Sequence, residues 1–164
     1  MTPKMMISQE LKNALDDAVH SELYASQLYK HVANQLQRLG WFGGQKFFAN
    51  ESADELTHYQ KIVDFQNDVG TVAKVPMIEA MTDPIADLVS AVELGYETEV
   101  ELYNDYKRWY GIAASGDPVV AQFLLQFLEI QRTSVGEYGD LLARLKLVEG
   151  DRAGLLLIDQ EMGA

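Results

Sequence analysis

The sequence contains no cysteine, which excludes disulfides, thiolate metal sites and cysteine nucleophiles and leaves histidine and the carboxylates as strong metal ligands. Basic residues are scarce, since 13 lysines and arginines stand against 25 aspartates and glutamates, for a formal net charge of −12. This charge disfavours nucleic acids and membranes as partners and favours cations. No apolar run approaches the roughly 18 residues of a membrane span, and the first residues lack the apolar core of a secretory signal, so we expect a cytoplasmic protein.

The apolar residues follow a helical pattern. The 164 residues, 48% of them hydrophobic, suffice for a single domain over 1–164 with one core. Steps of four and three residues trace four apolar stripes, the pattern of helices in a bundle, and the stripes run over 11–39, 44–69, 85–113 and 121–145. The residues that predict helix starts are Ser8, Asp83-Pro84 and Asp117-Pro118, and those that predict ends are Gly40 and Gly70.

The links between the stripes predict how the helices are connected. Short links at 40–44 and 111–116 predict two antiparallel hairpins. The link at 71–82 reaches roughly 40 Å when extended, the length of a helix of about 27 residues, so it allows the second and third helices to run parallel. The sequence therefore predicts an all-α four-helix bundle over about 8–147 with a long crossover between helices two and three. A short fifth helix is predicted at 151–162, and we expect its apolar block to bury against other subunits.

Each stripe is interrupted near its middle by a polar residue. The interruptions are Glu22 in the first stripe, Glu55 and His58 in the second, Glu99 in the third and Gln131 in the fourth. Because the middles of bundled helices share one layer, these residues predict a single buried polar site. No lysine or arginine lies in any stripe, and buried charges are normally paired or coordinated to metals. We therefore predict a metal site with Glu22, Glu55, His58 and Glu99 as ligands, the alternative being protonated, hydrogen-bonded carboxylates.

The ligand types restrict the metal, and neighbouring residues leave choices open. Carboxylates with one imidazole favour Fe(II), Mn or Zn, and a bridging Glu55 would allow two ions. Tyr29, seven residues after Glu22, is either a core aromatic hydrogen-bonded to a site carboxylate or a redox group. Glu51 faces a channel, solvent or the metal. His20 and His31 fall outside the stripes, so we expect them on the surface or in subunit contacts.

Taken together, these motifs resemble those of the ferritin family, specifically non-haem ferritins of bacterial and cyanobacterial type. Segments 22–29, 54–58 and 96–99 resemble the motifs of the first three helices, Gln131 matches the glutamine of the fourth, and 155–162 resembles the fifth helix. The resemblance implies a ferritin-like bundle that assembles into a 24-subunit cage. It also implies oxidation of Fe(II) by O₂ or H₂O₂ at a di-iron ferroxidase centre, storage of the ferric mineral inside the cage, and no haem.

The resemblance also implies a role for each site residue. Glu22, Glu55 and His58 would hold the first iron, and Glu55 and Glu99 the second, with Gln131 alongside and Tyr29 next to the site. Many bacterial ferritins carry further glutamates after that glutamine, whereas this chain has none at 132–135, which implies a weakly held second iron and no third site. Two alternatives are an iron-nucleating cage without rapid oxidation and a carboxylate-bridged di-metal oxidoreductase.

Overall fold

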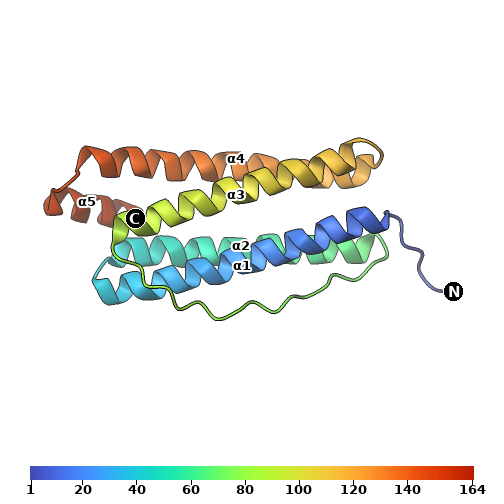
Figure 1. The fold of residues 1–164 in the computed structure, drawn as a ribbon, viewed down its shortest axis with the longest axis horizontal. Coiled ribbons are helices and arrows are strands. Elements are labelled where there is room, and N and C mark those ends of the chain that lie inside the picture. The colour runs from blue at the N-terminus through green and yellow to red at the C-terminus, as the bar shows by residue number, and fades with distance from the viewer.

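The computed structural model describes residues 1–164 and consists of five helices without strands (Figure 1). The helices are α1 (Gln9–Leu39), α2 (Phe42–Asp68), α3 (Leu88–Ala114), α4 (Pro118–Leu147) and α5 (Arg152–Met162). α1 and α2 form one antiparallel hairpin, α3 and α4 form the other, and the two pack side by side. The predicted all-α bundle with a short fifth helix is therefore confirmed. None of the helices has the length and apolar character needed to cross a membrane.

The predicted stripes supply the core of the bundle. Large aromatic side chains from all four long helices are fully buried, among them Tyr29, Phe48, Tyr106 and Phe127. Several predicted helix ends are also confirmed. The Ser8 side chain accepts the N–H of Leu11 at the start of α1. Gly40 ends α1 in the left-handed conformation, with φ at 89°, which glycine adopts without a Cβ clash.

The start of α3 differs from the prediction. The helix begins at Leu88, not at Asp83-Pro84, and its N-cap is Asp87, which forms a reciprocal capping box with Ser90. The residues before it are fixed in another conformation by α1, because Gln35 donates to the carbonyl of Asp83 and accepts the N–H of Ile85. A side chain distant in sequence thus prevents the helix from starting at the proline.

The crossover after α2 runs along α1 from one end of the bundle to the other and places α2 and α3 parallel (Figure 1). Its first part is held by Asp16, which accepts the backbone N–H of Lys74 at 2.9 Å and the side-chain amide of Gln66 at 3.1 Å. Its last part is held by Gln35, as described above. The long crossover predicted from the length of the link is confirmed.

The short helix α5 packs against the start of α2 in its own chain. The Asp159 carboxylate accepts the N–H groups of Gly43 at 3.1 Å and Gly44 at 2.7 Å, and Ile158 is buried. A Cβ on Gly43 would lie 1.5 Å from the carbonyl oxygen of Asp159, so only glycine fits there. The expectation that the apolar block 155–158 buries only against other subunits is therefore wrong, because Ile158 is buried within its own chain. Only Leu156 and Leu157 remain exposed, at 57% and 61%.

Candidate metal centre

The polar interruptions of the four stripes lie inside the bundle, and those of the first two stripes, Glu22, Glu55 and His58, come together there. Glu22 on α1, Glu99 on α3 and Gln131 on α4 are 0% exposed, and Glu55 on α2 is 4% exposed. His58 is half-buried beside them, with Nδ1 2.7 Å from Oε2 of Glu55 and 3.7 Å from Oε2 of Glu22. Glu22, Glu55 and His58 each offer one ligand atom, and these atoms lie within 4.8 Å of one another.

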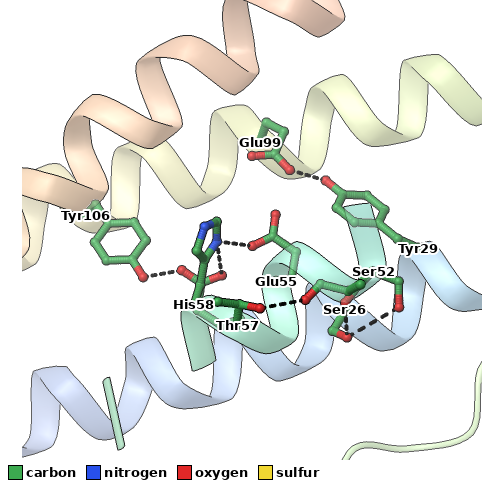
Figure 2. Close-up of polar contacts among 10 residues, drawn as sticks. Ser26, Tyr29, Ser52, Glu55, Thr57, His58, Glu99 and Tyr106 are labelled. Carbon is green, nitrogen blue, oxygen red and sulfur yellow. Dashed lines mark hydrogen bonds and ion pairs between the residues drawn. The ribbon is translucent and has the colours of Figure 1, made fainter. Parts of the chain in front are cut away.

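Two tyrosines donate hydrogen bonds to the carboxylates of this layer. The hydroxyl of Tyr29 donates to Oε1 of Glu99, which is one of the two roles considered for Tyr29 from the sequence. The hydroxyl of Tyr106 donates to Oε1 of Glu22. Figure 2 shows His58 and Glu55 between Tyr106 on one side and Tyr29 with Glu99 on the other. Tyr106 escaped the sequence analysis because its position is that of an ordinary core aromatic.

Several buried polar atoms of the site have no hydrogen-bond partner. They are Oε2 of Glu22, Oε2 of Glu99, both side-chain polar atoms of Gln131 and the hydroxyl of Tyr138. Leaving such a group unpaired in a dry interior costs about 1–3 kcal/mol, and more for a charged one. Carboxylate oxygens and a histidine nitrogen are suitable ligands for Fe(II), Mn(II) and Zn(II). The residues present therefore fit a cation that binds the unpaired oxygens.

Burial and mutual repulsion make the acidic layer retain protons. Burial raises the pKa of Glu55 and of Glu99 well above the ordinary range of a glutamate, and for Glu99 the charge of Glu55 adds to the effect. Burial alone would lower the pKa of His58, but its interactions with the carboxylates of Glu22 and Glu55 outweigh burial and raise it to about 10. A divalent cation that enters this layer must displace protons from it.

Three further residues considered from the sequence lie outside the four predicted ligands Glu22, Glu55, His58 and Glu99. Glu51, one turn before Glu55, is half-buried, and burial together with the charge of Glu55 raises its pKa to about 7. His20 is exposed and stacks on Tyr24. His31 lies with Nε2 2.8 Å from the carbonyl oxygen of Asp83, so it contacts the crossover of its own chain.

The chain is similar to known proteins over nearly its whole length. It is 27% identical over 159 residues to a probable bacterial non-heme ferritin-like protein of Haemophilus influenzae, with 96% of both chains covered. It is 26% identical to the bacterial non-heme ferritin of Bacteroides fragilis, over 96% of this chain and 99% of that one. The open pore ferritin of the archaeon Archaeoglobus fulgidus has the same fold, with a TM-score of 0.93 at 24% identity over 98% of both chains. The family model for the ferritin-like domain matches residues 12–148, so this chain belongs to the ferritin family.

Proposed function

We propose that this protein stores iron by oxidising Fe(II) at a di-iron centre within each subunit and retaining the ferric product inside a cage of 24 copies. The observation that carries the proposal is the pair of buried, unpartnered carboxylate oxygens on Glu22 and Glu99, in one layer with Glu55 and His58. With its carboxylates ionised, such a layer is unfavourable unless cations neutralise it. In this proposal Fe(II) enters the site as its substrate.

The donor atoms suggest two unequal positions for iron. Glu22, Glu55 and His58 would hold the first ion. Glu55 and Glu99 would hold the second, with Gln131 alongside. Because an amide carries no charge, and because Ser134 and Val135 offer no carboxylate on the next turn of α4, the second ion should be held more weakly.

The chemistry needs two electrons, and each Fe(II) supplies one. Two Fe(II) ions reduce one O₂ to H₂O₂ with the uptake of two protons, and H₂O₂ accepts two further electrons in the same way. The carboxylates stabilise the additional positive charge on each iron, which is greater in the product than in the substrate. Glu55 serves both positions in this assignment, so it keeps the two electron donors close together.

The exposed side of α5 supports assembly into a larger particle. Leu156 and Leu157 are adjacent leucines on a helix whose other side is already buried against α2. Exposed apolar surface of this kind is usually covered by another protein surface. We propose that copies of this chain cover it, as part of a closed cage of about 440 kDa built from chains of 18.4 kDa.

The test compares site variants with a surface control. His58→Ala and Glu22→Ala should each lose fast aerobic oxidation of Fe(II), followed by the absorbance of the ferric product, while His20→Ala retains it. Sizing should show that all variants assemble. If both site variants oxidise Fe(II) at the parental rate, the centre is elsewhere. If the parent itself only mineralises iron slowly, the protein is a nucleating cage without ferroxidase activity.

A further inference from the structure

The two tyrosines of the site form a crossed arrangement between α1 and α3. Tyr29 lies seven residues after Glu22 on α1, and Tyr106 lies seven residues after Glu99 on α3. Seven residues of helix rise about 10 Å, and the two helices run antiparallel (Figure 1), so each tyrosine reaches the carboxylate of the other helix. Tyr29 therefore donates to Glu99, and Tyr106 donates to Glu22.

The carboxylates of Glu22 and Glu99 have the same pattern of hydrogen bonding. In Glu22 and in Glu99, Oε1 accepts the phenolic hydroxyl, while Oε2 is buried without a hydrogen-bond partner. In Glu22 the unpartnered oxygen is the one that lies 3.7 Å from Nδ1 of His58. In Glu22, therefore, Tyr106 holds one oxygen and the other oxygen is directed toward His58.

Tyr106 is held rigidly enough to act in this way. Its ring stacks on Phe127 with a centroid distance of 5.0 Å and an angle of 9° between the planes. On another side Trp109 packs edge-on at 5.1 Å, and Tyr106 is fully buried. Phe127 also contacts the ring of His58 at 5.9 Å, so Tyr106, Phe127 and His58 pack as one unit. The hydroxyl has little freedom to leave Glu22.

We propose that Tyr106 is a positioning residue for the first iron: it holds Oε1 of Glu22 and leaves Oε2 as the single donor atom toward the metal. Tyr29 does the same for Glu99 at the second iron. Each iron position then has its own tyrosine, supplied by the opposite helix. This inference rests on the proposed di-iron centre and concerns metal binding, so it does not need oxidation to be observed.

The experiment is an anaerobic Co(II) titration of the assembled protein after iron removal. Co(II) binds without being oxidised as Fe(II) is, and its visible absorption bands depend on the number and geometry of its ligands. The variants are Tyr106→Phe and Tyr29→Phe, which keep the rings and remove only the hydroxyls. Tyr110→Phe, a half-buried tyrosine on α3 that makes no hydrogen bond to the site, is the matched control. The bands that disappear in His58→Ala identify the first ion.

We expect the parent and Tyr110→Phe to bind two Co(II) ions per subunit. Tyr106→Phe should lower the affinity for the first Co(II) ion by about tenfold and change its visible bands. The reason is that losing a partner that orients a metal ligand typically costs 10–100-fold in affinity. Tyr29→Phe should have this effect on the second ion only. A general change in packing would lower the affinity for both ions and not for one ion alone.

Three results would overturn the inference. If the parent binds two ions and Tyr106→Phe matches it in affinity and bands, the positioning role is wrong and the di-iron centre stands. If either tyrosine variant weakens both ions equally, the tyrosines act through packing and not through one carboxylate each. If the parent binds no Co(II), the proposed di-iron centre fails and the inference fails with it.

Discussion

Replacing Glu51 with glutamine should stabilise the iron-free protein, and more so at alkaline pH. Burial and the charge of Glu55 raise the pKa of Glu51 from its ordinary value of 4.5 to about 7. When folding raises the pKa of a group, the protonated group contributes its full stabilisation at pH values below the pKa of the unfolded chain. This contribution is lost as the pH rises to the pKa of the folded protein. The parent should therefore lose stability between about pH 4.5 and 7 because of this one side chain, and Glu51→Gln should not.

The size of the effect follows from the two pKa values. Their difference corresponds to about 3 kcal/mol in the free energy of unfolding, at 1.36 kcal/mol for each pH unit. Between pH 5 and pH 8 the advantage of Glu51→Gln over the parent should grow by about 2–3 kcal/mol. For a chain of this length, 1 kcal/mol shifts the melting temperature by roughly 2–4 °C, so the gap should widen by about 5–10 °C.

The assay is thermal unfolding of both proteins, followed by circular dichroism at pH 5 and pH 8 with a chelator present. Glu149→Gln, which replaces an exposed glutamate near the end of the bundle, is the matched control and should show no such widening. If the difference in melting temperature between Glu51→Gln and the parent is the same at both pH values, the pKa of Glu51 is not raised by folding. This result would mean that Glu51 is hydrated and that the charge of Glu55 does not change its pKa.

Two further predictions concern proton release and the docking of α5. The pKa of His58 is raised to about 10 and that of Glu55 is also raised, so metal binding should release protons and should weaken as the pH falls from 8 to 6. Calorimetry in buffers of different ionisation enthalpy measures the number of protons released. Binding without proton release would contradict this prediction. Asp159→Ala should leave the N–H groups of Gly43 and Gly44 without an acceptor and weaken the docking of α5 by about 2 kcal/mol. We therefore expect α5 to detach and become sensitive to protease while α1–α4 stay helical. An α5 that stays protected in this variant would show that the two bonds do not hold it.

Much of the fold could be predicted because the relevant signals are local. The stripes repeat with the helical period, so they predict the four long helices, and the length of the link after α2 predicts the crossover. The positions of Glu22, Glu55, His58 and Glu99 follow from the same periodicity. Charged residues at core positions stand out from the apolar pattern. The structure brings Glu22, Glu55 and His58 together and buries Glu99 beside Tyr29.

Features that depend on contacts between distant segments could not be predicted. The start of α3 depends on Gln35 of α1, which binds the backbone around Asp83 and Ile85. The start of α2 has no side-chain cap of its own; the carboxylate of Asp159, more than a hundred residues later, takes that place. No local pattern indicates either partner.

The role of Tyr106 depends on a spacing and not on its own position. An aromatic residue at a core position of a helix is usually only a core residue. The signal that could have identified Tyr106 is the repeat of one spacing, since Glu99 and Tyr106 are seven residues apart, as are Glu22 and Tyr29. The repeat has meaning only once α1 and α3 are known to be antiparallel neighbours.

The central claim is that each subunit oxidises Fe(II) in pairs, and the stoichiometry of the fast reaction tests it most directly. Aerobic Fe(II) is added in increments to the assembled, iron-free protein while absorbance and O₂ consumption are recorded. We expect a fast phase that saturates at two Fe(II) per subunit, consumes one O₂ for each two Fe(II), and is absent in His58→Ala. A fast phase that saturates at one Fe(II) per subunit, or one that persists in His58→Ala, would contradict it.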